Sequence, residues 1–458
     1  MTHFQFFQTY TNLLLQLSLS ISLTLVIIFL KIPIFFLHGL HTYIHPENLG
    51  NGVRAAIRRP DSSDSGHAEV RKRSKSKDKF EFDESNAQIF RLKLDEAHLR
   101  SRLYFDEYRN AFTISFVAIS SLSLHIFLKN DASEKSGFFM GGIFVPVLFG
   151  FVAVFKILMV LGKLSFEKSA SRRSEKQLGV LFGVFGVILG SLTCYNITSS
   201  VLDFDFGSID GFGRFFIAVL MGCLAGLLFV PATKIARSFW LGTDQLRSNL
   251  SMITCGSFAR VILYANYLVI TLTALLWIKP LSEMLVNKSI DDGKGSHLVN
   301  EIGNAERLLG NVGFLRSDFA RIRIWCLFIS GVSQLVALRP NLQMYLNEAL
   351  LSWYQRLHAS KEPDLDFSRA KVFLHNHFLC LVVLQFLMPP LLLLLFLGLS
   401  QVDISHFEVD YQFVCSLLPC SDFVRELALF MAWWVVFVSA VYTSATISLF
   451  RRGNLCVS

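Results

Sequence analysis

Only a few residues of this chain have the types and spacing that a catalytic or metal centre requires. Asp203 and Asp205 have the spacing of the acidic metal-binding pair of sugar transferases, although two acids close together in an acidic segment are common. His375 and His377 are also two apart, which on a helix puts their rings on different faces and makes a poor metal site. Gly-rich phosphate loops, His-Glu-x-x-His and Cys-x-x-Cys are absent from the sequence. We therefore expect no cofactor, no metal and no enzymatic activity, with an enzyme that uses the acidic pair as an alternative.

The composition requires a membrane around these residues. Of 458 residues, 52% are hydrophobic and 17% charged, and the mean hydropathy is +0.47, which excludes a soluble globular protein. Apolar blocks of roughly 18 to 25 residues, long enough to cross the hydrocarbon core, recur along the chain. Because a membrane-spanning helix satisfies its own backbone groups, we predict an all-α transmembrane bundle. About nine spans are expected, at Leu13–Leu30, Ala111–Leu128, Phe138–Leu161, Leu178–Ile197, Phe215–Ala232, Val261–Ile278, Ile324–Leu338, Phe378–Leu399 and Leu427–Phe450.

Two of these spans need further argument. The first block resembles a signal peptide in length, which would leave eight spans, but no Lys or Arg precedes Leu13 and no small-residue cleavage pattern precedes Lys31. We expect an uncleaved first helix. The seventh block is short, so it needs the stem of Arg323 to reach the interface.

The net charge of +8 indicates how the chain is oriented in the membrane and is not by itself evidence of a binding partner. Basic residues alternate between connections, with 15 from Lys31 to Arg109 and 5 from Lys163 to Lys176, but none from Ser400 to Asp422. By the positive-inside rule the N-terminus lies outside or in the lumen and the C-terminus in the cytosol. The membrane is either the plasma membrane or one of the endomembrane system, and no nucleic-acid partner is expected.

The outer loops carry sites of covalent modification. Asn196 and Asn287 begin Asn-x-Thr and Asn-x-Ser sequons, so they are glycosylation candidates, although such triplets also arise by chance. Cys415 and Cys420 share one outer loop in an oxidising compartment and are candidates for a short-loop disulfide.

The first cytosolic loop is expected to contain two interfacial helices separated by disorder. Ile32–Leu40, interrupted by Pro33, is expected to lie along the inner leaflet. The segment 51–79 has little to bury, and its basic run at 71–79 either binds anionic lipid or is a solvated tract that sets topology. From Ser85 a capping box and a stripe that ends at Leu103 predict a second helix.

A stronger amphipathic pattern follows the seventh span. Apolar residues from Leu342 to Leu357 recur at spacings of three and four, opposite polar residues. Pro340 disfavours helix at Arg339, so we expect a turn there, with the following helix on the inner membrane face. That helix would dock either against the bundle of the same chain or into the groove of a partner.

Few polar residues lie within the predicted spans, and none of them is Asp or Glu. Lys156 either snorkels to the headgroups or has a functional role facing the bundle. Gly222 and Gly226 form a small-xxx-small face for tight helix packing, with a dimer seam, and hence a homo-oligomer, as the alternative. Pro389, followed by Pro390, is expected to kink or break its helix, and Gln385 can satisfy a freed backbone group one turn earlier.

The stretch from Leu335 to Leu346, which contains Arg339-Pro340-Asn341-Leu342-Gln343, resembles the transmembrane protein 161 family of A/B type. Further similar stretches run in the same order along almost the whole chain: Tyr43–Pro46, Arg102–Tyr108, Lys156, Gly222–Gly226 with Pro231, Trp277–Pro280 and Leu384–Pro389. The spacing from Gly226 to Pro231 is one residue shorter than the family pattern, and Pro390 is an extra proline, which affects local helix geometry.

The resemblance implies a multi-pass membrane protein without an established enzymatic activity or substrate. It also implies an association with cation-current regulation and stress responses, as in animal relatives, and eight spans if the first segment is a signal peptide. Our leading hypothesis is a non-enzymatic modulator or scaffold of other membrane proteins such as ion channels, with a transporter or channel as the alternative. The expected organisation is a first span or signal anchor at 1–30, a basic loop at 31–110, spans two to seven at 111–338, a cytosolic amphipathic helix and loop at 339–371, and the last two spans with a short tail at 372–458.

Overall fold

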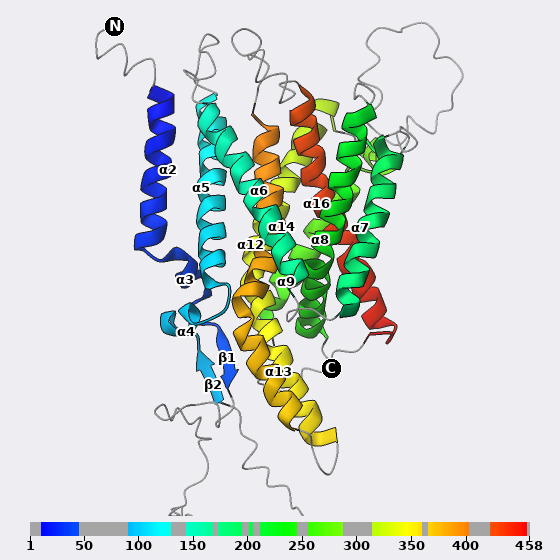
Figure 1. Ribbon diagram of the computed structural model, residues 1–458. Coiled ribbons are helices and arrows are strands. Elements are labelled where there is room, and N and C mark those ends of the chain that lie inside the picture. The colour runs from blue at the N-terminus through cyan, green and yellow to red at the C-terminus, as the bar shows by residue number, and fades with distance from the viewer. Residues whose placement is uncertain are drawn as a thin grey trace, which may run out of the picture.

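The computed structural model describes residues 11–44, 90–129, 143–167, 173–194, 201–204, 211–244, 255–286, 314–359, 365–402 and 422–455. Within these residues, nine helices are long and apolar enough to cross a membrane, which confirms the predicted bundle (Figure 1). They are α2 (Thr11–Phe29), α5 (Phe105–Lys129), α6 (Phe144–Phe166), α7 (Arg173–Cys194), α8 (Gly211–Thr243), α9 (Ser257–Leu275), α12 (Arg316–Ala359), α14 (Leu379–Ser400) and α16 (Asp422–Arg451).

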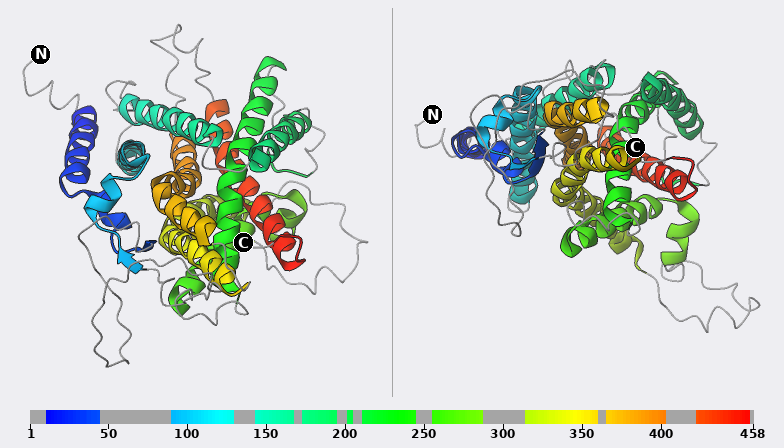
Figure 2. Two further views of the ribbon diagram at one scale, coloured as in Figure 1. Left: turned by 60° about the horizontal axis from the view of Figure 1, so that its bottom comes forward. Right: turned by 90° about the horizontal axis from the view of Figure 1, so that it is seen from below.

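Helix α14 is the central helix of the bundle. Its 22 residues include no charged side chain, and all of them except Gly398 are buried, as expected for a helix that is apolar on every side. It packs against α5, α6, α8, α12 and α16. Helices α2 and α7 lie at opposite edges of the bundle when it is viewed from below (Figure 2).

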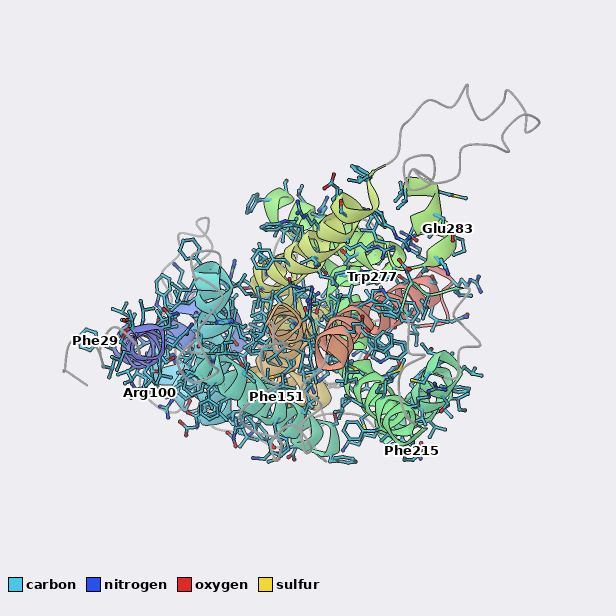
Figure 3. The ribbon with its side chains drawn as sticks, turned by 90° about the horizontal axis from the view of Figure 1, so that it is seen from above. Phe29, Arg100, Phe151, Phe215, Trp277 and Glu283 are labelled. Carbon is cyan, nitrogen blue, oxygen red and sulfur yellow. The ribbon has the colours of Figure 1, made fainter. Side chains whose placement is uncertain are left out.

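The outer faces of the peripheral helices carry exposed apolar side chains. Phe151 on α6 and Phe215 on α8 point outward from the rim, with 40% and 62% of their surface exposed (Figure 3). An apolar rim of this kind is compatible with contact to lipid tails. Helix α2 has few buried residues, but the amide group of its Gln16 hydrogen-bonds Ser121 Oγ of α5 at 2.9 Å, which ties it to the bundle.

Several short elements extend beyond the end of the bundle that Figure 1 draws at the bottom, which we call the lower end. Helix α2 begins at the upper end and α16 ends at the lower end, so the path contains an odd number of crossings. The short elements are α3 (Ile32–Leu37), β1 (His41–Ile44), β2 (Phe90–Lys93), α4 (Glu96–Arg100) and α13 (Leu365–His377), joined by the last turns of α12. We call this set the lower platform. A short helix, α10 (Lys279–Leu285), lies at the upper end.

The lower platform differs from the expected pair of interfacial helices. Ile32–Leu37 is helical, with Pro33 in the first turn, where proline costs no hydrogen bond. In its described part the helix expected from Ser85 to Leu103 forms only at Glu96–Arg100 (α4), because Phe90–Lys93 pairs as an antiparallel strand with His41–Ile44. Backbone pairing with a distant segment outweighs the local helical pattern here, and Tyr104, with φ of 66°, separates α4 from α5.

The turn expected at Arg339 is absent. Helix α12 continues from Arg316 to Ala359 with Pro340 inside it. Proline removes one backbone hydrogen bond and crowds the preceding turn, but Leu338 and Leu342 on either side are buried against the bundle core. Burial of both segments against the same core offsets the local cost, so the amphipathic segment forms the lower half of a long helix.

Candidate functional site

Gly222 and Gly226 pack within the chain. A Cβ atom at Gly222 would lie 2.7 Å from the Gly183 oxygen of α7, and one at Gly226 would lie 2.9 Å from the Gly179 oxygen. The small residues of α7 and α8 therefore face each other at backbone contact distance, the geometry typical of small-xxx-small seams. A Cβ atom at Gly222 would also overlap with Val187 Cγ2 of α7, so this position has no room for a side chain.

Lys156 is half-exposed on α6. It lies close enough to Glu107, at the start of α5, to interact with it electrostatically. Glu107 also accepts a hydrogen bond from Lys163 Nζ at 2.9 Å. Lys156 therefore belongs to the charged surroundings of the lower end and is not buried in the bundle interior.

Arg339, Gln343 and Asn347 form one row on α12, because residues four apart lie on the same helix face. Arg339 Nη2 donates to the His38 oxygen at 2.9 Å. Gln343 bonds both backbone groups of His41, accepting from its N–H at 2.9 Å and donating to its oxygen at 3.1 Å. The row thus binds the backbone that leads into and starts β1.

The next residues of β1 are held by side chains from two helices. Tyr43 donates from its hydroxyl to Asn347 Oδ1 at 3.1 Å, and burial raises the pKa of that hydroxyl, which keeps it a donor. Asn376 of α13 is buried, donates to the Tyr43 oxygen and accepts from Thr42 Oγ1. Side chains therefore bond β1 on one side, while β2 pairs with it through the backbone. We call these contacts the strand clamp.

A second polar group, the lower charge cluster, joins α8, α12, α13 and α14. Glu348 of α12 is buried, with 7% of its side chain exposed, and lies 3.4 Å from Arg237 Nη1 and 3.8 Å from Lys371 Nζ. Lys234 Nζ of α8 donates to Gln385 Oε1 of α14 at 2.8 Å. Gln385 therefore serves as the acceptor for a lysine. Because the Glu348 carboxylate is buried among several cations, removing either the carboxylate or a cation would leave buried charge less well compensated.

His375 of α13 borders the lower charge cluster. Its ring stacks on Tyr345 of α12 with centroids 4.6 Å apart, and Nδ1 lies 2.9 Å from the Lys371 oxygen. Burial lowers the pKa of His375 more than the nearby Glu348 carboxylate raises it, so the imidazole is neutral near pH 7. His375 is thus a buried packing residue at the junction of α12 and α13.

The cluster corrects one prediction from the sequence. No acid was expected within a span, yet α12 continues through Glu348 and buries its carboxylate. Glu348 lies beyond the predicted end of that span at Leu338, on the polar face of the predicted amphipathic helix. Lys234 also lies beyond the predicted end of its span, because the span was expected to end at Ala232 whereas α8 continues to Thr243. The charge of each residue was visible in the sequence, but which helices would surround it was not.

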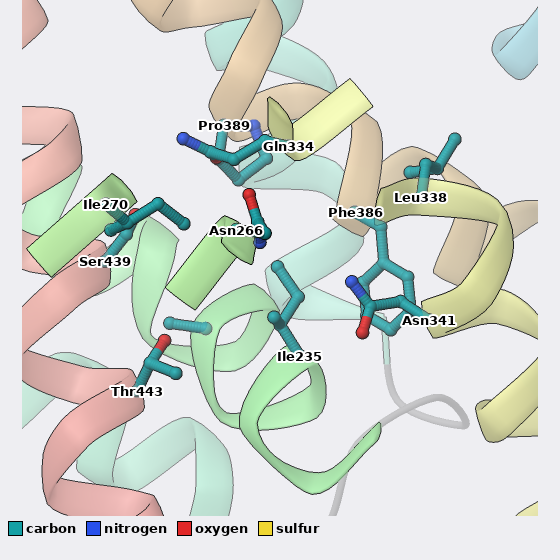
Figure 4. Close-up of a pocket in the computed structure, with 11 residues that line it drawn as sticks. Ile235, Asn266, Ile270, Gln334, Leu338, Asn341, Phe386, Pro389, Ser439 and Thr443 are labelled. Carbon is teal, nitrogen blue, oxygen red and sulfur yellow. The ribbon is translucent and has the colours of Figure 1, made fainter. Parts of the chain in front are cut away.

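A small cavity with both polar and apolar lining residues lies beside Pro389. Its volume is about 20 Å³, and α14 forms a single helix through Pro389 and Pro390, without the expected break. The close-up shows Asn266 beside Gln334 and Pro389, with Asn341 at another side of the cavity (Figure 4). Ser439 and Thr443 of α16 line it as well. The cavity is lined by amides, hydroxyls and apolar side chains from five helices, and no charged residue takes part.

At the upper end Asp203 is held in an ion pair. Its Oδ2 lies 2.6 Å from Nη1 of Arg323, whose side chain is 8% exposed. The Arg323 guanidinium also packs over the rings of Trp277 and Phe319, at 4.9 and 4.4 Å. Arg323 therefore lies inside the upper end of the bundle and has a fixed partner. Asp205, the other member of the acidic pair, lies outside the described residues.

Several predicted sites cannot be placed. Asn196, Asn287, Cys415, Cys420 and the basic run at 71–79 lie outside the described residues. Cysteines within the described part are free thiols, at Cys194, Cys223, Cys255, Cys326 and Cys380. The described ranges also contain no group of three His, Cys, Asp or Glu side chains arranged to hold a metal ion.

A family model described as predicted transmembrane protein 161AB matches residues 208–413. The match extends from the start of α8 past the end of α14, and it includes Arg339, Gln343, Glu348 and Gln385. It confirms the resemblance recognised in the sequence. No solved structure matches the chain.

Proposed function

We propose, from the premise that this chain is a member of the transmembrane protein 161AB family, that it is a non-enzymatic modulator or scaffold of other membrane proteins such as ion channels. The single observation that carries the proposal is the strand clamp. Arg339, Gln343 and Asn347 use their hydrogen-bonding groups to hold β1. These polar side chains stabilise a defined surface, the lower platform, and their hydrogen-bonding groups are already used in doing so.

We propose that the lower platform faces the cytosol. Basic side chains gather at the lower end, and the positive-inside rule then makes that side cytosolic. They include Lys31, Arg91, Lys93, Arg100, Arg102, Lys163, Arg237 and Lys371. The N-terminus is accordingly outside or lumenal and the C-terminus cytosolic, in the plasma membrane or an endomembrane. The basic run at 71–79 is proposed to meet anionic lipid on the same side.

The platform has the features of a docking surface for the cytosolic part of a neighbouring membrane protein. Arg91 and Lys93 of β2 are exposed, and so are Phe373 and Leu374 of α13, at 53% and 43%. Aromatic and basic side chains together suit recognition of an acidic or amphipathic partner segment. A surface held on α12 and α13 would also transmit the position of a partner to the bundle.

One observation bears on an enzyme that would use the acidic pair. Asp203 is paired with Arg323, so its carboxylate is engaged in an ion pair. An enzyme that uses Asp203 and Asp205 would lose activity but keep its fold on the change Asp203→Ala, whereas loss of an ion pair predicts a lower Tm.

One alternative has support of its own. A transporter or channel would be built around polar positions inside the bundle, and the cavity beside Pro389 and, separately, the buried Glu348 are two such positions. Against it, Glu348 is already neutralised by Arg237 and Lys371.

A position-specific crosslinking experiment tests the scaffold. A photo-crosslinking residue at Arg91 of β2 or Phe373 of α13 should capture other integral membrane proteins in native membranes. The same residue at Val184, a lipid-facing position of α7 with 54% exposure, is the matched control. The capture should be lost when the clamp is opened by Gln343→Ala. If the crosslinks formed only to further copies of this chain, the platform would be the interface of a homo-oligomer and not a docking surface for another membrane protein.

Reconstitution provides the opposing result. The purified chain in proteoliposomes should not conduct ions or solutes by itself. A specific flux that Lys234→Gln abolishes, in a variant with normal thermal stability, would overturn the accessory function and establish the transporter or channel.

A further inference from the structure

We propose that the cavity beside Pro389 is an internal hydration site, which holds one ordered water molecule inside the transmembrane bundle. The cavity lies where α8, α9, α12, α14 and α16 meet (Figure 4). A second cavity of about 20 Å³ adjoins it and shares Asn266 and Asn341. A site of this volume accommodates one water molecule, which needs roughly 10 to 15 Å³.

The lining contains a hydrogen-bond acceptor without a donor. Asn341 is 4% exposed, and its Oδ1 has no hydrogen-bond partner within the described part of the chain. Leaving a buried acceptor unpaired costs roughly 1 to 3 kcal/mol. The neighbouring Asn266 is already engaged, since its Oδ1 accepts from Ser333 Oγ at 3.0 Å. A water molecule in the cavity would provide the missing donor to Asn341.

The two prolines of α14 create further demand for a donor. In an α-helix the N–H of each residue donates to the oxygen four residues earlier. Pro389 and Pro390 have no N–H, so the oxygens of Gln385 and Phe386 lose that donor. Phe386 and Pro389 both line the cavity, which places this part of α14 beside it. A water molecule has two hydrogens, one for Asn341 Oδ1 and one for a freed backbone oxygen of α14.

The lining favours water over an ion. Among the described residues no carboxylate lines the cavity, so a cation would lack a compensating charge from them. The hydroxyls of Ser439 and Thr443 can bond a neutral water molecule in either direction. The site thus compensates for a double proline in the central helix without a buried charge.

The first test uses Asn341→Leu, which replaces the amide by an apolar group of similar shape. If a water molecule bridges Asn341 and α14, the change removes one of its hydrogen-bond partners and leaves the water and the α14 backbone oxygen less well satisfied. The Tm should then fall by about 2 °C in detergent. An empty cavity predicts the reverse, because removing an unpaired acceptor leaves the Tm unchanged or raises it. Val336→Leu, at a 53% exposed position of the same helix, is the control and should leave the Tm unchanged.

The second test is a high-resolution density map of the unchanged protein, which decides the matter even if the variant does not fold. A peak should lie within about 3.2 Å of Asn341 Oδ1 and disappear in Asn341→Leu. An empty cavity in the unchanged protein would overturn the proposal. A peak that strengthens when Tl⁺ replaces Na⁺ and K⁺ would also overturn it, because the occupant would then be a monovalent cation. Neither result bears on the scaffold, which rests on the strand clamp.

Discussion

Arg339 donates a hydrogen bond from Nη2 to the main-chain oxygen of His38 at 2.9 Å, across 301 positions of sequence. The bond joins the middle of α12 to the connection between α3 and β1. Because Gln343 and Asn347 continue the same row, the contact is the first of a series that holds β1 against α12. The long helix thereby links the bundle core to the lower platform.

The strand clamp predicts a local change in backbone protection. In Gln343→Ala, the His41 N–H loses the acceptor that it now has at 2.9 Å. Hydrogen exchange of peptides covering His41–Ile44 should accelerate at least tenfold, while the bundle core keeps its protection. Exchange measured by mass spectrometry gives the answer, with α14 as the internal reference. Equal exchange in both proteins would show that pairing with β2 alone holds the strand.

The lower charge cluster predicts a large cost for removing its single carboxylate. Glu348→Gln removes the carboxylate charge that lies 3.4 Å from Arg237 Nη1 and 3.8 Å from Lys371 Nζ, and we expect a loss of about 2 kcal/mol, since Arg237 is one-third exposed and partly screened. The loss should appear as a lower Tm in detergent. Glu96→Gln is the matched control, because the pairs of Glu96 with Lys31 and Arg100 are exposed and should leave the Tm unchanged. Equal Tm values for the two variants would contradict a structural role for Glu348.

The close packing of α7 against α8 predicts that adding a single methyl group at Gly222 destabilises the protein. In Gly222→Ala the new Cβ would lie 2.2 Å from Val187 Cγ2 and 2.7 Å from the Gly183 oxygen, so the helices must separate. We expect a loss of about 2 kcal/mol. Gly162→Ala in α6 is the control, since nothing lies within 4 Å of that position, and alanine should be neutral or add about 0.5 kcal/mol. If the two variants unfold at the same temperature, the seam is looser than its geometry indicates.

His375 predicts a dependence of stability on pH. Its pKa is lowered by burial, so below the ordinary value near 6.5 the unfolded chain takes up a proton that the folded chain does not. Stability contributed by neutral His375 is therefore present above pH 6.5, falls as the pH drops below it, and levels off below the folded pKa. Thermal unfolding between pH 7.5 and 5.5 should show this fall. In His375→Phe, which keeps the stacking on Tyr345, the fall should be smaller. An unchanged pH profile would assign the dependence to another group.

Several features followed from the sequence alone. The nine spans are determined by the length of uninterrupted apolar segments, because the hydrocarbon core admits helices of that length and little else. Each predicted span overlaps one of the nine apolar helices in the described part of the chain, which are α2, α5 to α9, α12, α14 and α16. Gly222 and Gly226 were also recognisable as residues for tight helix packing, because a residue without a Cβ lets a neighbouring helix approach closely.

Only the tertiary structure decided how the polar residues are used. Pro340 was expected to end a helix, and β2 was expected to be one, yet α12 continues and Phe90–Lys93 pairs with a strand 49 positions away. Glu348 was predicted only to lie on the polar face of an amphipathic helix, and in the folded chain it is buried between Arg237 and Lys371. Local propensity amounts to about 1 kcal/mol per residue or less, except at proline. Packing against segments far along the chain outweighs it, and those segments are brought together only when the chain folds.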